Sequence, residues 1–138
     1  MARIALILLL AFAGSLIASS SKPLLGGWED IDPNDEHLLN LAHIADIPLS
    51  RKLNSPLQYV ATKVTSAKKQ VVNGFNYMLA VTFYPTACPT PNNRKGNDVY
   101  SHIHCTPKLN ESPVHYNVNI YHNSNGEVTL TSIDKLLL

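Results

Sequence analysis

Cysteine and histidine can act as nucleophile, base or metal ligand, and both occur in this chain. The 138-residue sequence has two cysteines and six histidines, which come closest together in "HIHC", residues 102–105. In a strand, His102 and His104 would lie on one face and Cys105 on the other, and a second ligand cluster with zinc-site spacing is missing. We therefore favour a structural role for Cys88 and Cys105 over a metal site or a reactive thiol, and we expect no metal, no cofactor and no enzyme.

The run "QVVNG", residues 70–74, is the other segment whose composition suggests a task. Asn73-Gly74 between two strand-like runs is a strong signal for a β-hairpin, so the simplest interpretation is a turn. Two valines at an exposed turn are unfavourable unless something covers them. The segment is therefore also a candidate for a protein-binding tip.

The N-terminus has the three-part layout of a secretory signal peptide. Arg3 precedes an apolar run over residues 4–18, and small residues follow. The run is short for a membrane span. We expect cleavage near residue 20, which removes residues 1–20 and leaves one secreted, extracellular domain at residues 21–138 with a modest core.

The charge and cysteine content of that domain limit its partners. Removing Arg3 from the eleven Lys and Arg residues leaves ten, which balances the ten Asp and Glu residues. Nucleic acids and anionic membranes require a clustered positive surface, so we expect neither as a partner, and we expect a monomer. In an oxidising compartment a Cys88–Cys105 disulfide is expected, with a stabilisation of about 3 kcal/mol.

Helix signals occur once, in "DIDPNDEHLLNLAHIA". Asp32 can cap the helix and Pro33 suits its first position. Pro48 predicts an end or a kink near Asp46–Ile47. One face is apolar, so the helix should bury a stripe made of Leu38, Leu41, Ala42 and Ala45.

Strand-like alternation begins near Leu57, and a polar, proline-rich loop is expected over residues 85–98. The four alternating runs span residues 59–69, 75–84, 114–122 and 127–133. One early helix followed by antiparallel hairpins predicts an α+β fold, with a sheet packed on a single helix.

The segments "QVVNG", "AKKQVVNGFNYML" and "TACP", with "LLGG" at residues 24–27, are similar to stretches of secreted cystatins. Gln70, Val72 and Gly74 match the pattern of the first binding loop of that family. The resemblance covers roughly residues 24–134 and is to type 2 cystatins, including tick members. It implies a cystatin-like fold, about five antiparallel strands wrapped around one helix, and matches Cys88 and Cys105 to one of the family's two disulfides.

The resemblance further implies a reversible, competitive, tight-binding inhibitor of papain-like cysteine proteases of the cathepsin L, S and B type. Cystatins insert a wedge of three segments into the protease cleft. In the trunk, the two leucines would fill apolar pockets and a glycine would pass the catalytic cysteine uncut. In the first tip, the valines would supply apolar contact, and Gln70 and Asn73 would hydrogen-bond at the rim. The carried-over residues are Leu24, Leu25, Gly26 and Gly27 in the trunk, Gln70, Val71, Val72, Asn73 and Gly74 in the first tip, and His122, Asn123 and Ser124 in the second.

Two features depart from the type 2 pattern. The second hairpin lacks the Pro-Trp pair of vertebrate members, so affinity should depend on the trunk and the first tip, with His122 able to supply partial stacking. The second cysteine pair is also missing, and Tyr116 is near the first lost position. The last hairpin must then be held by packing, through Val118, Ile120, Val128 and Leu130.

Two alternatives stay open. Some secreted cystatins inhibit legumain through an asparagine after the helix, and Asn54 falls at that place, although "NSP" is also a simple turn. The same fold also serves in secreted binding or precursor modules that inhibit nothing.

Overall fold

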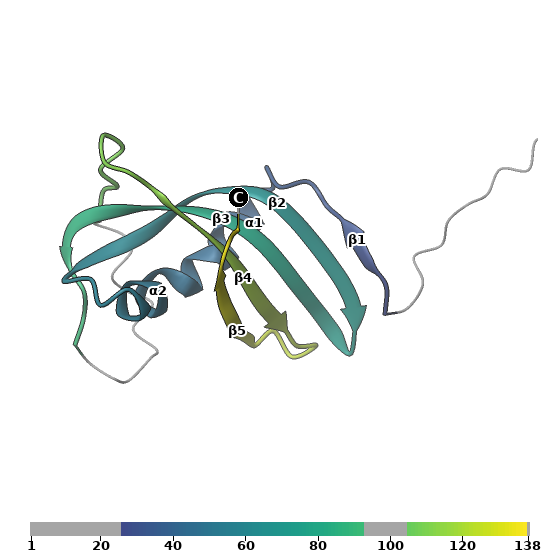
Figure 1. Cartoon of the computed structure of the whole chain (residues 1–138). Coiled ribbons are helices and arrows are strands. Elements are labelled where there is room, and N and C mark those ends of the chain that lie inside the picture. The colour runs from purple at the N-terminus through teal and green to yellow at the C-terminus, as the bar shows by residue number, and fades with distance from the viewer. Residues whose placement is uncertain (1–25, 93–104, 138) are drawn as a thin grey trace, which may run out of the picture.

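The structure is a computed structural model that describes residues 26–92 and 105–137 (Figure 1). The expected signal peptide, Leu24, Leu25, His102 and His104 lie outside these ranges. Within them, no helix is long and apolar enough to cross a membrane. The elements are β1 (Trp28–Asp30), α1 (Glu36–Ala42), the 3-10 turn η1 (His43–Ala45), α2 (Asp46–Lys52), β2 (Leu57–Val72), β3 (Gly74–Pro89), β4 (Val114–His122) and β5 (Val128–Lys135).

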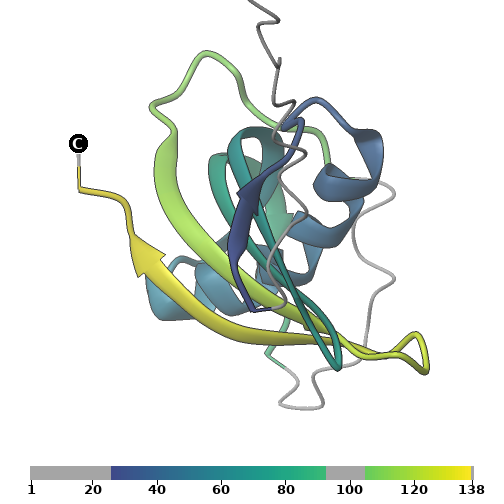
Figure 2. The same ribbon diagram turned by 90° about the vertical axis from the view of Figure 1, so that its right-hand side faces the viewer.

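The five strands form one antiparallel sheet in the order β1-β2-β3-β4-β5, curved around the helical run (Figures 1 and 2). The predicted α+β class, with five strands and one helix, is confirmed. Alternation along β3 and β4 directs one face of the sheet at the helix. The core between the two layers includes Leu38, Leu41, Ala42, Ala45, Leu49, Leu79, Val81, Phe83, Val118 and Ile120.

The helix begins later than predicted. Asp35 is the N-cap, and its side chain accepts the N–H of His37 at 2.9 Å. Asp32 accepts the N–H of Asn34 at 2.9 Å in the turn before the helix. Both aspartates can bond an N–H two residues ahead, and the cap forms at Asp35, directly before the first helical residue, Glu36.

Pro48 does not end the helix. The interruption is the 3-10 turn η1, immediately before the expected Asp46–Ile47 position, and α2 then continues through Pro48 to Lys52. Proline has no N–H, but Pro48 is the third residue of α2, where N–H groups have no acceptor within the helix. The helical run therefore covers 17 residues.

The loop expected over residues 85–98 begins later, because β3 continues to Pro89. Thr86 stabilises this end of the strand: its hydroxyl donates to the Gln58 carbonyl at 2.8 Å and accepts the N–H of Cys88 at 3.1 Å. The predicted Cys88–Cys105 disulfide is formed, with the two Cα atoms 5.8 Å apart. It attaches the end of β3 to the segment before β4.

Apolar packing holds the last hairpin, as predicted from the missing cysteines. Val118 and Ile120 are fully buried, and Val128 and Leu130 pack against the core from β5. Tyr116 is also buried, so an aromatic ring occupies core space at the start of this hairpin.

Asp46 is a fully buried carboxylate that joins the helical run to β2. Its Oδ1 accepts the N–H of Ala61 at 2.8 Å, and its Oδ2 lies 2.9 Å from Nδ1 of His43. One turn on, the Ser50 hydroxyl donates to the Asp46 carbonyl and accepts the N–H of Tyr59 at 2.8 Å. A buried charge is costly without partners, so these bonds favour one register of helix against strand.

Replacing Asp46 by alanine should destabilise the domain by about 3 kcal/mol, because the Ala61 N–H loses its acceptor and His43 its partner. Asp46→Asn should cost less, since the amide can still accept from Ala61 and donate to a neutral imidazole. Urea unfolding followed by circular dichroism measures both. Glu36→Gln, at an exposed carboxylate of α1, is the control and should change the free energy of unfolding by less than about 1 kcal/mol. An alanine variant as stable as the parent would contradict the role of Asp46.

Candidate functional site

Three segments that are distant in sequence meet at one end of the sheet (Figures 1 and 2). They are the start of β1, the β2–β3 turn and the β4–β5 loop. Strand register brings them together: Trp28 pairs with Gln70, Val72 with Gly74, and Phe75 with His122. We call this end, residues 26–27, 70–74 and 122–124, the three-segment edge.

The β2–β3 turn is tighter than the predicted Gln70–Gly74 loop. β2 continues to Val72 and β3 starts at Gly74, so Gln70 and Val71 belong to the ladder and Asn73 alone lies between the strands. The Val72 side chain is 40% exposed. Long paired strands thus present a short, pre-formed tip.

Gly74 is required for two reasons, of which the sequence predicts one. Its φ of +103° is a conformation that other residues rarely adopt. In addition, a Cβ at this position would lie 2.4 Å from the His122 carbonyl oxygen and 3.0 Å from the Asn123 Cα. The first tip therefore packs directly on the backbone of the second hairpin.

Tyr121 adds a second link between the hairpins, which the sequence does not predict. Its hydroxyl donates a hydrogen bond to the Asn73 carbonyl. Alternation along "VHYNVNIYH" identifies the face of β4 on which Tyr121 lies, but the acceptor is 48 residues away in sequence. The backbone of Asn73 is thus fixed from β4, while its side chain is exposed at the tip.

The base of the expected trunk is bonded to the first hairpin. The Gly26 N–H donates to the Val71 carbonyl at 3.2 Å, and the Gln70 carboxamide donates to the Gly26 carbonyl at 2.7 Å. Gln70 also accepts a bond from Asn76 at 3.0 Å. The Gln70 side chain is expected to hydrogen-bond a partner at the rim. In the structure its carboxamide bonds Gly26 and Asn76 of the same chain.

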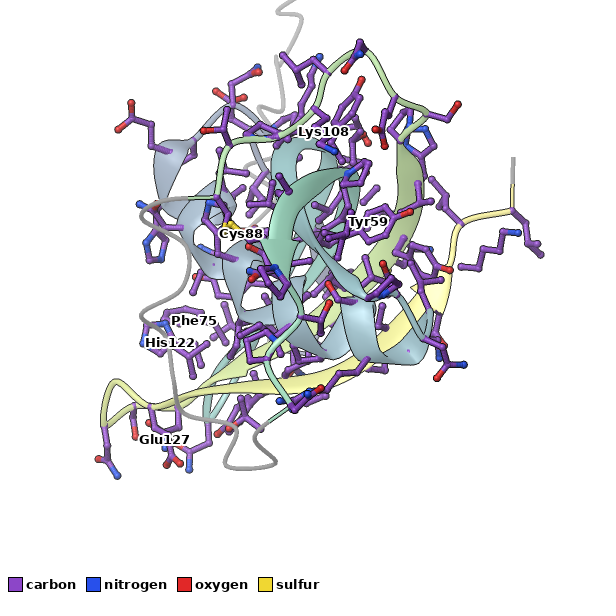
Figure 3. All side chains as sticks on the ribbon, turned by 90° about the vertical axis from the view of Figure 1, so that its left-hand side faces the viewer. Tyr59, Phe75, Cys88, Lys108, His122 and Glu127 are labelled. Atoms are coloured by element: carbon purple, nitrogen blue, oxygen red, sulfur yellow. A yellow bond between two sulfur atoms is a disulfide. The ribbon has the colours of Figure 1, made fainter. Side chains whose placement is uncertain are left out.

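Asn123 closes the second tip with its backbone, through bonds to Glu127 and Gly126, and with its side chain. Asn123 Oδ1 accepts the N–H groups of Asn125 and Glu127, both at 2.9 Å, and Asn123 Nδ2 lies 3.1 Å from a Glu127 carboxylate oxygen. Asn123 thus shapes the turn, while Ser124 is exposed. His122 lies beside Phe75 (Figure 3).

The three-segment edge is partly apolar and carries no formally charged residue. Trp28, Val72 and Phe75 are exposed at or next to it, at 44%, 40% and 38%. Behind it, the Lys69 ammonium lies 5.2 Å from the centre of the Phe75 ring and 3.8 Å from a Glu29 carboxylate oxygen. Residues 26–27, 70–74 and 122–123 can therefore enter another protein's cleft without removing a carboxylate or ammonium from water, whereas the exposed Glu127 carboxylate of the β4–β5 loop, which bonds Asn123, would have to stay in solvent.

Tyr77 lies in the core behind the first tip. Its burial, and secondly the Asp35 carboxylate, raise the pKa of the Tyr77 phenol above its ordinary value of 10.0. The phenol therefore remains neutral well beyond physiological pH.

Both cysteines lie away from this edge. Cys88 is near the end of β3 opposite to Gly74 and is bonded to Cys105, so neither is a free thiol. Across residues 26–92 and 105–137, no group of three His, Cys, Asp or Glu side chains could hold a metal ion.

Asn54 lies in a separate place, after α2, and the β2–β3 ladder runs from there toward the three-segment edge. It is exposed and has a φ of +50°, unusual for a residue other than glycine. The next residues are anchored: the Ser55 N–H donates to the Ser50 carbonyl at 2.9 Å, and the Thr90 hydroxyl donates to the Ser55 carbonyl at 2.9 Å. Beside Asn54 is an open hollow of about 540 Å³, lined also by Arg51, Pro56, Pro89, Thr90 and Pro91.

Comparisons with known proteins agree with this geometry. The sequence model of the Cystatin domain matches residues 26–121. Cystatin-1 of Ornithodoros moubata is 30% identical over 106 residues, covering 76% of this chain and 77% of the relative. Cystatin-1 of Chilobrachys guangxiensis is 35% identical over 98 residues, covering 71% and 69%.

Solved structures of cystatins have the same fold as this chain. The crystal structure of the salivary cystatin from the soft tick Ornithodoros moubata has a TM-score of 0.66 and 27% identity, covering 81% of this chain and 98% of the other. Mialostatin, a gut cystatin from the hard tick Ixodes ricinus, has the same fold, with a TM-score of 0.65. The match over residues 26–121 includes the trunk glycines, the first tip and the helical run. This chain belongs to the cystatin family.

Proposed function

We propose that this protein is a reversible, competitive, tight-binding inhibitor of papain-like cysteine proteases of the cathepsin L, S and B type. The observation that carries the proposal is the three-segment edge itself. Three segments from different parts of the chain are hydrogen-bonded or packed against one another at one end of the sheet. Such a surface loses little conformational entropy when it docks.

Each segment has a part suited to a substrate cleft. Val72 offers an exposed apolar side chain at the foremost tip. Gly26 precedes β1 with a φ of +89°, a backbone conformation that glycine adopts readily and other residues rarely do. In the proposed complex the trunk occupies the non-primed side of the cleft, where Leu24 and Leu25 fill apolar pockets, and no carbonyl at Gly26 or Gly27 is placed for attack.

The second hairpin contributes less in this proposal. Its Asn123 side chain bonds within the turn, and His122 rests beside Phe75. Ser124 and the His122 ring remain for polar contact or partial stacking. A large aromatic anchor is absent from "HNSNG", so affinity depends on the trunk and the first tip.

The proposed setting is extracellular. Residues 1–20 have the layout of a cleaved signal peptide. The chain also contains a disulfide between Cys88 and Cys105, and disulfides are typical of secreted proteins. The tick proteins with this fold are a salivary and a gut cystatin.

A second activity, legumain inhibition, is favoured by the conformation of Asn54. This exposed asparagine has a positive φ in a loop whose backbone is hydrogen-bonded to α2 and to Thr90, the residue after β3. A rigid asparagine of this kind can present its amide to an asparagine-specific protease while resisting cleavage. The site is separate from the three-segment edge, so both proteases could bind at once.

Titration of the purified mature domain against papain, cathepsins L, S and B, and legumain tests these proposals. Competitive inhibition of papain with a slow dissociation rate is expected. A folded domain that inhibits none of the papain-like enzymes would favour the alternative, a cystatin-fold binding or precursor module.

Substitution of Gly74 should weaken inhibition of papain far more than substitution of Gly126. Both glycines have positive φ, but a Cβ at Gly126 meets nothing within 4 Å, whereas one at Gly74 meets the His122 carbonyl. Gly74→Ala therefore adds a steric clash to a strain of about 1–3 kcal/mol that both variants share. Inhibition constants with parallel thermal unfolding separate the effects, and equal losses in the two folded variants would refute the packing role of Gly74.

Removal of the trunk through Gly26 should weaken inhibition of cathepsin L at least about tenfold, because burial of two leucine side chains is lost. Leu24→Ser with Leu25→Ser in the full-length mature chain should reproduce most of this loss. If the truncated protein inhibits as strongly as the parent, the Leu pair is only a tether.

Asn54→Gln should abolish legumain inhibition and leave papain inhibition within about twofold, because the longer amide no longer meets a site shaped for asparagine. Ser124→Gln is a matched exposed control for the legumain assay. Retention of legumain inhibition by Asn54→Gln would remove Asn54 from the proposed site.

A further inference from the structure

We propose that Asn76, a residue outside all three binding segments, positions the trunk for inhibition by orienting the Gln70 carboxamide. The proposal rests on the inhibitory function proposed above. Asn76 lies on β3 directly opposite Gln70, on the sheet face that points away from the helix. It is half-buried and does not belong to the tip.

Three hydrogen bonds make up the link. Asn76 Nδ2 donates to Gln70 Oε1 at 3.0 Å, and Gln70 Nε2 donates to the Gly26 carbonyl at 2.7 Å. The Gly26 N–H completes the connection to β2 through the Val71 carbonyl at 3.2 Å. The base of the trunk is thus bonded on both its N–H and its C=O.

The orientation of each amide follows from its partners. A carbonyl can only accept, so the Gln70 nitrogen must face Gly26. The Gln70 oxygen then faces Asn76, which must present its own nitrogen. Without a donor at position 76, the Gln70 amide could rotate and place its oxygen against the Gly26 carbonyl, which would release the trunk.

Trp28 is a convenient reporter of this release. It is the single tryptophan of the chain, two residues beyond Gly26, and pairs with Gln70 across the β1–β2 ladder. Its side chain is 44% exposed, so its fluorescence anisotropy should respond to motion at the base of the trunk. The measurement needs no protease.

Asn119→Ala is the matched control for Asn76→Ala. Asn119 lies on β4 on the same sheet face, and its Nδ2 donates to the Ser132 hydroxyl at 2.7 Å. The control variant therefore also loses one side-chain hydrogen bond on this face, but that bond has no connection to Gly26. Asn76→Asp is the specific variant, because it keeps the size of the side chain and removes the donor.

The experiment compares these variants in the mature chain and in a chain lacking the residues through Gly26. Loss of one hydrogen bond predicts that Asn76→Ala and Asn76→Asp weaken papain inhibition about fivefold in the mature chain and less than about twofold in the truncated chain. Trp28 anisotropy should fall in both variants of the mature chain and remain at the parent value in Asn119→Ala.

Equal weakening with and without the trunk, or an Asn119→Ala variant that behaves like Asn76→Ala, would overturn the proposal. If the parent itself fails to inhibit papain, the proposed function is wrong. The anisotropy comparison still decides the role of Asn76 in that case, since unchanged Trp28 anisotropy in both Asn76 variants would refute it.

Discussion

The contact between Gly74 and the second hairpin is the constraint on which the three-segment edge depends. A single methyl group added to Gly74 would lie 2.4 Å from the His122 carbonyl oxygen, so the two hairpins approach as closely as backbones can. Tyr121 reinforces the contact by donating to the Asn73 carbonyl. The two turns are thus packed and hydrogen-bonded together, and Gly26 is bonded to the first of them through Gln70.

The stabilising bonds and the proposed binding surface lie at opposite ends of the long β2–β3 ladder. Toward its far end, Asp46 and Ser50 bond the helical run to β2, and the disulfide attaches the end of β3 to the segment before β4. At its near end, the first tip, residues 70–74, has no charged residue and no cysteine. This separation lets the core determine the shape of the tip without placing buried charges next to the surface that a protease would contact.

Local patterns predicted much of the fold. The buried stripe of the helix, the hairpin at Asn73-Gly74 and the packing of Val118 and Ile120 follow from periodicity and turn chemistry. What could not be predicted depends on partners that are distant in sequence. The bond from the Asp46 carboxylate to the Ala61 N–H spans 15 residues and requires the folded register of helix against strand.

The backbone of the β4–β5 turn is fixed by residues at its two ends, which affects which substitutions the turn can accept. Asn123 holds the turn through its own carboxamide, and Gly126 supplies the positive φ, so the shape of the loop does not depend on the side chains between them. Ser124 and Asn125 are exposed. These two positions should therefore tolerate substitution, and an aromatic side chain placed there could alter the protease preference of the proposed inhibitor.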